Sequence, residues 1–269
     1  MLAGYRVWAR AQVWRSGPRI FVNSLPKAGT HLLTAELARF AGLQNSGLHL
    51  EGARIGVGGA TTPDGYPVID PRKVASAIRT VRRGQFFSAH LYWTQELEDA
   101  ISDSGAATLF MIRDPRDILL SRMHYILGLR RHRLHDFLGQ RFDNAADRLR
   151  VLVSGNAVEP FIRPMRTDLA SFARWIERPG VLTVRFEDLV GERGGGSERA
   201  KRAALEAIAH HCGLDPSGLA EQAASGAGAT PTLRKGQIGG WRSELPGEVV
   251  DAVDRECGDL LAAMGYRSG

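Results

Sequence analysis

The stretch FVNSLPKAGTHLL, residues 21–33, decides the fold. Its apolar start predicts a buried strand over 20–25, and the apolar spacing that follows predicts a helix over 30–41. A glycine-bearing turn between a strand and a helix N-terminus gathers backbone amides around an anionic group. The nucleotide triphosphatase loop reads G-x-x-x-x-G-K-[ST], whereas here Lys27 precedes Gly29. The stretch therefore predicts an anion site in a different class of enzyme.

Strand and helix signals alternate along the rest of the chain. Three further strands are expected, at 85–91, 107–114 and 181–189. Helices are expected after the capping pair Asp70–Pro71 and over 115–129, 199–213 and 246–266. The glycine-rich stretch 42–70 is expected to be mostly loop. Alternating strands and helices, with no internal repeat or clear linker, predict one α/β domain with a mainly parallel sheet.

Composition sets broad limits on the function. The 269 residues are 43% hydrophobic, as expected for a globular protein with a substantial core. Lys and Arg (35) outnumber Asp and Glu (29), and this excess suits an anionic ligand, nucleic acid or an anionic membrane surface. Cys212 and Cys257 form no CxxC pair, which favours a reducing, cytoplasmic location over a disulfide framework or a structural zinc site.

The N-terminal segment, residues 1–18, is basic and aromatic. Over residues 1–15 it interleaves Tyr, Val and Trp with Arg, and it lacks the uninterrupted apolar core of a secretory signal. We expect its aromatic side to pack on the domain, with weak peripheral contact with a membrane as the alternative. No apolar run is long enough to predict a membrane-spanning helix.

Two further stretches place cations beside an apolar segment or in a glycine-bearing loop. FMIRDPRDILLSRMHY, residues 110–125, has Arg113 at the end of an expected strand. LRKGQIGGWR, residues 233–242, has Arg234 and Lys235 directly before Gly236. With the turn at Lys27, three such places on one chain predict a ligand with more than one phosphate-like group.

The ordered set resembles the sulfotransferases that use 3′-phosphoadenosine 5′-phosphosulfate (PAPS). The family motif P-K-[SA]-G-[TS]-[TH], after a strand, is matched by residues 26–31. An arginine after a strand, with a serine eight positions on, is matched by Arg113 and Ser121. R-K-G-x-x-G-x-W-[KR] is matched by residues 234–242, and RFEDL at 185–189 weakly matches a Y-E-D element. The resemblance implies a three-layer, P-loop-like domain over 1–269, with a central, mainly parallel sheet flanked by helices.

The resemblance also implies how PAPS is bound. PAPS would be the sulfuryl donor, PAP the product, and no metal is expected. The 5′-phosphosulfate is assigned to Lys27, Ala28, Gly29, Thr30 and His31 with the amide of Leu32, and the 3′-phosphate to Arg113, Ser121, Arg234, Lys235 and the amide of Gly236. Lys27 beside the bridging oxygen would stabilise the charge that develops as the sulfuryl group leaves. Leu32 and Phe186 occupy the family's adenine positions, and Phe186 can stack although it lacks the tyrosine hydroxyl.

His90 is the expected general base. It follows an expected strand, where the family has the histidine of a K-T-H-L-P element, although Ser88 and Tyr92 replace the lysine and the proline. An unperturbed histidine pKa near 6.5 suits a base at neutral pH. The alternatives are His31, His49, His124 and Glu51. Trp241 either closes over the nucleotide or anchors its loop.

The acceptor is the least determined part of the interpretation. We expect transfer to a hydroxyl, and less readily to an amine, of a small-molecule, lipid or carbohydrate acceptor. Its site is expected to be lined by residues 43–69, 128–168 and 223–233. Two other functions stay open: an ATP-dependent small-molecule kinase, and a non-catalytic basic module that binds anionic membrane or nucleic acid. The missing triphosphatase order opposes the first, and the placement of Lys27, His90 and Arg113 opposes the second; no nucleic-acid partner is expected. The oligomeric state is not predicted.

Overall fold

The computed structural model describes residues 17–159, 162–176, 178–217 and 236–267. A five-stranded sheet with the order β2-β5-β1-β6-β7 lies at its centre, and every neighbouring pair is parallel. Its strands are β1 (Arg19–Ser24), β2 (Gln44–Leu50), β5 (Gln85–Ala89), β6 (Ala106–Ile112) and β7 (Val181–Arg185). A separate antiparallel hairpin joins β3 (Gly56–Thr61) and β4 (Pro67–Ile69).

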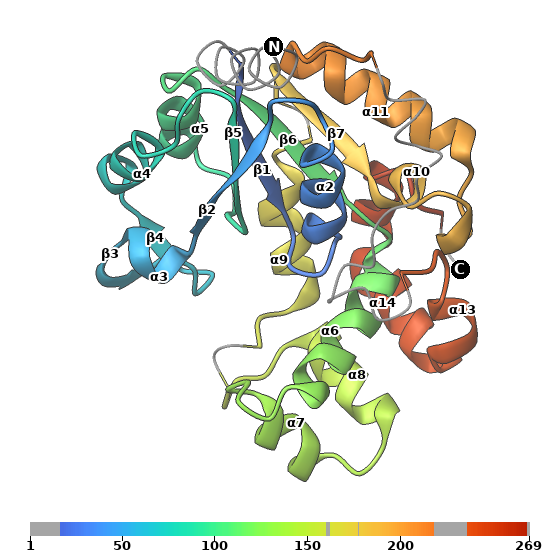
Figure 1. Cartoon of the computed structure of the whole chain (residues 1–269). Coiled ribbons are helices and arrows are strands. Elements are labelled where there is room, and N and C mark those ends of the chain that lie inside the picture. Colours follow the sequence, from blue (N-terminus) through green and yellow to red (C-terminus); the bar gives the residue numbers. More distant parts are fainter. Residues whose placement is uncertain (1–16, 160–161, 177, 218–235, 268–269) are drawn as a thin grey trace, which may run out of the picture.

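Helices cover both faces of the sheet (Figure 1). One face packs against α2 (Thr30–Leu37), α10 (Phe186–Leu189) and α11 (Glu198–Cys212). The core on the other face includes residues of α4 (Pro71–Ile78), α5 (Gln95–Ser102), α6 (Pro115–Gly128), α9 (Met165–Ala173) and α14 (Gly247–Ala263). Helices α7 (His135–Arg141) and α8 (Ala145–Ser154) extend this core by packing against α6. The remaining described elements are two short α-helices, α3 (Gly52–Ile55) and α13 (Trp241–Glu244), and the 3₁₀ helix η1 (Glu192–Gly194).

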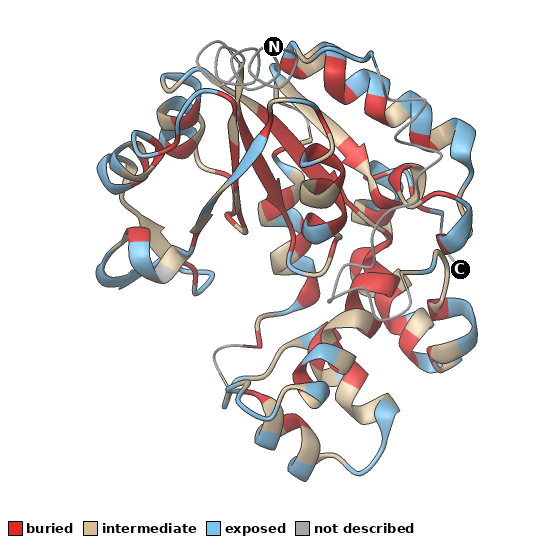
Figure 2. Cartoon of the chain, in the orientation of Figure 1, coloured by how far each residue is buried: buried red, intermediate tan, exposed pale blue. Residues whose placement is uncertain are grey.

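The strand sequence explains why there are two cores. Successive side chains of a strand point to opposite faces, so Ile20 and Val22 enter the core beneath α2, while Phe21 enters the opposite core. All three side chains are fully buried. The strands form the buried centre of the molecule between two helical layers, and the expected three-layer α/β fold is confirmed (Figure 2).

Capping residues start two of the helices where the sequence predicts. The Asp70 carboxylate accepts hydrogen bonds from the amides of Arg72 and Lys73, and proline follows it at the first helical position. Asp114 caps α6 in the same way, by accepting from the amide of Arg116. Asp114 directly follows Arg113, so this cap fixes how the chain leaves β6.

Two expectations about local structure were wrong. The stretch 42–70 is not mostly loop, because it contains β2, α3 and the β3–β4 hairpin. Strand β2 is half exposed at the sheet edge, so its polar sequence lacks the apolar signal of an interior strand. The strand expected over 181–189 ends at Arg185, and 186–189 form the helical turn α10. Within the described residues, no helix is both long and apolar enough to cross a membrane. Residues 1–15, the candidate membrane contact, lie outside the described part of the chain.

Candidate active site

Four of the predicted functional residues lie just beyond strand ends. His90 follows β5, Arg113 follows β6 and Phe186 follows β7, while Lys27 lies three residues past the end of β1. Since the strands are parallel, their carboxyl ends meet at one edge of the sheet. Ligands of open α/β sheets bind in the crevice outside that edge.

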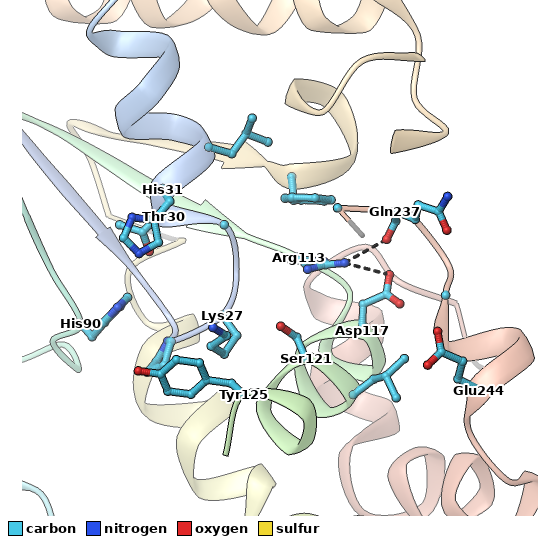
Figure 3. Close-up of a pocket in the computed structure, with 17 residues that line it drawn as sticks. Lys27, Thr30, His31, His90, Arg113, Asp117, Ser121, Tyr125, Gln237 and Glu244 are labelled. Atoms are coloured by element: carbon cyan, nitrogen blue, oxygen red, sulfur yellow. Dashed lines mark hydrogen bonds and ion pairs between the residues drawn. The ribbon is translucent and has the colours of Figure 1, made fainter. Parts of the chain in front are cut away.

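A cavity of about 330 Å³ lies at this edge (Figure 3). We call it the first cavity. The predicted residues that line it are Lys27, Gly29, Thr30, His31, Leu32, His90, Arg113, Ser121, Phe186 and Gly236. Ala28 does not line it, because its side chain is fully buried and its amide donates to the Leu25 carbonyl. Arg234 and Lys235 lie outside the described residues, and Gly236, the next residue in the sequence, lines the cavity.

Lys27 occupies an unusual backbone conformation. The Ala28 amide is 3.1 Å from the Leu25 carbonyl oxygen, which closes a turn with Pro26 at its second position and Lys27 at its third. The φ angle of Lys27 is 75°, and a positive φ at the third turn position favours glycine. This conformation costs a residue with a side chain about 1–2 kcal/mol. Strain of this kind collects at functional sites, where the geometry of one side chain matters more than local stability.

Gly29 is required for a different reason. It is the N-cap of α2 with φ 111°, and a Cβ atom there would lie 2.6 Å from the Phe186 ring. The amide of Leu32 turns back to the Gly29 carbonyl. The amides of Gly29, Thr30 and His31 have no hydrogen-bond partner in the described part of the chain. Such orphan donors at a helix N-terminus are where anions bind.

Arg113 lies on the opposite side of the cavity, and not all of its N–H donors have a hydrogen-bond partner among the described residues. Its Nη2 donates to the Gln237 carbonyl at 2.9 Å and lies 3.8 Å from the Asp117 carboxylate. The guanidinium stacks on the Phe186 ring at 4.1 Å. Its Nε is buried and, within the described residues, makes no hydrogen bond. Burial also lowers the pKa of Arg113, which indicates that its charge is not fully compensated by the carboxylates around it.

Asp117 joins the C-terminal loop to helix α6. Its carboxylate accepts from the amides of Gly239 at 2.8 Å and Trp241 at 3.0 Å. The Trp241 indole donates to Asp114 at 3.0 Å, and Arg116 stacks on its ring at 3.8 Å. Trp241 is buried and does not line the first cavity, so it anchors the loop rather than covering this cavity.

Hydrogen bonds to the end of β1 hold His90 and the residue after it in place. Its Nδ1 lies 2.9 Å from the Ser24 carbonyl. Because a carbonyl only accepts, Nδ1 carries the proton of the neutral ring and Nε2 keeps its lone pair. The Asn23 side chain accepts from the amide of Leu91 at 3.0 Å and donates to its carbonyl at 2.8 Å. The residue after the candidate base is therefore tied to β1 on both sides.

A second cavity, of about 410 Å³, adjoins the first. The two share Pro26, Lys27, His90 and Tyr125. Most of its other walls are apolar and come from the turn after β1, from β4, α6, α8 and α9, and from the segment after β5. Of the segments expected to line the acceptor site, 43–69 and 128–168 both contribute residues, and 223–233 lies outside the described part of the chain.

The sulfotransferase domain family matches residues 17–265. The chain belongs to this family. It is a PAPS-dependent sulfotransferase, and the expected family and fold are confirmed. The mouse sulfotransferase SULT7A1, solved in complex with PAP, superposes with a TM-score of 0.60 at 18% identity, over 91% of this chain and 85% of that one. Retinol dehydratase, in complex with retinol and PAP, gives a TM-score of 0.55 at 16% identity, over 95% and 85%. No curated protein matches the sequence significantly.

Helix α6 forms the wall between the two cavities of this sulfotransferase. Asp117, Leu120 and Ser121 line the first cavity, whereas the second is lined by Ile118, Leu119, Arg122 and Ile126. Tyr125 borders both, and the Nζ of Lys27 lies 3.9 Å from its ring centroid (Figure 3). Lys27 is therefore positioned where the two cavities meet.

The electrostatic surroundings of His90 keep its ring neutral. Burial lowers the pKa of His90 to about 4. The hydrogen bond to Ser24 opposes this shift, while His49, His31 and Lys27 add to it. At neutral pH the ring is therefore unprotonated and able to accept a proton at Nε2.

The other candidate bases lie elsewhere. His31 lines only the first cavity, and His124 pairs with Glu244 at 3.2 Å. His49 stacks edge-on to His90 at 5.0 Å and contacts Ser88 at 2.9 Å without lining either cavity. Glu51 is exposed at the start of α3. Of the five candidates, His90 alone borders both cavities.

Several residues of the site were not predicted from the sequence. Asn23, Asp117 and Tyr125 are the main ones, and each acts on a partner distant in the chain. The available signals were a polar side chain inside an apolar strand for Asn23 and a carboxylate one helical turn after Arg113 for Asp117.

Proposed function

We propose that this sulfotransferase moves a sulfuryl group from PAPS to the hydroxyl of a small-molecule acceptor, with His90 as general base and Lys27 beside the leaving phosphate. The observation that carries the proposal is that Lys27 and His90 border both cavities. A group that helps the donor and a group that deprotonates the acceptor must both lie where the two substrates meet.

The first cavity fits a doubly charged nucleotide. The unpartnered amides of 29–31 and the ammonium of Lys27 would hold the 5′-phosphosulfate. Arg113, with its unpartnered Nε, would hold the 3′-phosphate together with Ser121 and the amide of Gly236. We place Arg234 and Lys235 in the same phosphate site on the family motif alone. Phe186 and Leu32 would contact the adenine.

The chemistry assigned to these residues is an in-line displacement. PAPS supplies an activated sulfuryl group when bound. The acceptor oxygen forms a bond to sulfur as the bond from sulfur to the bridging oxygen breaks. The acceptor proton passes to Nε2 of His90, and the electron pair of the broken bond stays on PAP, where Lys27 stabilises it. The anionic substrate beside His90 favours its protonated form, which raises its basicity when it is needed.

The second cavity is the proposed acceptor site. Its volume suits a drug-sized molecule, and its apolar walls suit an apolar body that carries one hydroxyl. The structurally similar retinol dehydratase was solved with retinol, a small apolar alcohol, which supports this class of acceptor. The buried, unpaired Cys212 and Cys257 support a cytoplasmic location, which we also propose.

The test is a transfer assay on the full chain. Purified protein is incubated with PAPS and a mixture of alcohols and phenols, and sulfated products are detected by mass spectrometry. We expect products from the wild type, about 100-fold less from His90→Asn, and unchanged affinity of that variant for PAP by calorimetry. Failure to bind PAP would overturn the proposal. Thermal stabilisation by ATP–Mg²⁺ but not by PAP would favour the kinase alternative.

A further inference from the structure

The second cavity contains one polar cluster in otherwise apolar surroundings. The Asp168 carboxylate accepts from the Tyr66 hydroxyl at 2.6 Å and from Nε of Arg163 at 3.0 Å. Nη1 of Arg122 lies 3.4 Å from the other oxygen of the same carboxylate. All four of these side chains line the cavity. Two guanidinium groups thus share a single carboxylate, and one positive charge is left over.

The rest of the cavity does not neutralise this charge. Among the described residues that line it, Asp168 is the one acidic side chain, while His132 and Arg133 add further basic groups. The charges of Arg163 and Arg122 lower the pKa of Arg133 after the effect of burial, and Glu159 opposes them. The cluster is therefore electropositive, even though the walls around it are apolar.

Asp168 uses only one of the hydrogen-bond donors of Arg122. One arginine and the Tyr66 hydroxyl already satisfy Oδ1 of Asp168, and Arg163 also donates to the Gly65 carbonyl at 3.4 Å. Arg122 makes one long contact to Oδ2, and no other hydrogen bond of its guanidinium is found in the described part of the chain. Each guanidinium has five donors, so several remain for a ligand.

We propose that the acceptor carries an anionic group, a carboxylate or a phosphate monoester, that Arg122 and Arg163 bind. This inference rests on the proposed function, because it assigns the occupant of the same second cavity. The planar arginine fork pairs with two oxygens of such a group at once. Arg122 lies three residues before Tyr125 on α6, so their Cα atoms are about 4.5 Å apart along the helix axis, and the anion site and the junction of the cavities share one helix. The acceptor is thus an apolar molecule with a hydroxyl near one anionic group.

The experiment compares acceptors that differ only in charge. Calorimetry on the full chain loaded with PAP measures binding of 3-hydroxylaurate, its methyl ester and 3-hydroxydodecyl phosphate, which all carry the hydroxyl close to the varied group. We expect both anions to bind about 10- to 100-fold more tightly than the ester, since hydrogen bonds between charged groups are the strong ones. The tighter of the two anions identifies the carboxylate or the phosphate as the preferred group.

Substitutions of Arg122 and of Asp168 are expected to change the affinity for the anionic acceptors in opposite directions. Arg122→Gln is expected to lower the affinity for the anions about tenfold and leave the ester unchanged. Asp168→Asn removes the competing carboxylate and keeps the side-chain shape, so it is expected to raise the affinity for the anions. Arg79→Gln removes an exposed charge next to α4, outside both cavities, and should change neither. A purely structural role of the cluster would weaken acid and ester together.

The outcomes separate this inference from the proposed function. Equal affinity for the acid and the ester, or binding of neither, overturns the anionic acceptor, whereas PAP binding and sulfation of a neutral alcohol would still support sulfuryl transfer. Loss of PAP binding by the wild type overturns both. Unchanged PAP affinity and melting temperature of each variant establish that it is folded.

Discussion

Lys27 combines an ammonium that we propose acts in sulfuryl transfer with a strained backbone, and two substitutions separate these contributions. Lys27→Ala removes the ammonium and keeps a side chain at φ 75°. Lys27→Gly removes the ammonium and relieves the strain. Because both variants lack the ammonium and its contact with the Tyr125 ring, their difference in stability isolates the backbone term.

The magnitudes follow from the turn geometry. A positive φ costs a residue with a Cβ about 1–2 kcal/mol. Glycine gives back about 0.5–1 kcal/mol through the greater freedom of its unfolded chain. The glycine variant should therefore be more stable than the alanine variant by about 0.5–1 kcal/mol. Both should lose about 10²–10³-fold in kcat, the usual effect of removing one preplaced group that stabilises developing charge.

Three measurements test this reasoning: initial rates at saturating PAPS, PAP affinity by calorimetry, and urea unfolding without ligand. PAP affinity should fall much less than kcat, because PAP lacks the sulfuryl group whose departure Lys27 assists. The reasoning is refuted if the alanine variant keeps its kcat within a factor of about three, or if it is at least as stable as the glycine variant.

Three further predictions concern the walls of the first cavity. Gly29→Ala should lower the free energy of unfolding by about 2–4 kcal/mol in urea, because a strained φ and an overlap with Phe186 act together; a loss under about 1 kcal/mol would contradict the cradle geometry. Asp117→Ala leaves two loop amides unpaired, so PAP affinity measured by calorimetry should fall about tenfold or more, whereas the exposed Asp64→Ala should have no effect. His90 should titrate near pH 4 by NMR in the ligand-free protein, and a midpoint near its ordinary value would count against its burial. Since the unfolded state then binds more protons between about pH 4 and 6.5, the free energy of unfolding should fall as the pH is lowered through that window, and less so in His90→Gln.

The sequence predicted most strands of the sheet and the residues that follow their carboxyl ends. The interior strands β1 and β6 contain apolar runs, Ile20–Val22 and Leu109–Ile112, and the residues that follow them can be named without a structure. Strand β2 was missed because an edge strand with one solvated face needs few apolar residues. The strand at 181–189 was drawn too long because apolar Phe186 and Leu189 are buried in a helical turn just as they would be in a strand.

Tertiary pairing explains what the sequence did not predict in the site. Asp117 acts on a loop that lies more than a hundred residues later in the chain, and Asn23 fixes the segment that follows the neighbouring strand. Neither partner is visible in local spacing. The charge cluster at Asp168 is likewise assembled from three separate segments, so composition alone indicated only a basic protein.

Because α6 lines the two cavities with different faces, the proposed functions of acceptor recognition and PAPS binding would depend on different sets of residues of one helix. Substitutions at Ile118, Arg122 or Ile126 would change the shape of the second cavity, the proposed acceptor site. Asp117 and Ser121, which line the first cavity, would keep their places. New acceptors could therefore be sought by randomising the residues on one face of α6 while the residues that line the first cavity are kept unchanged.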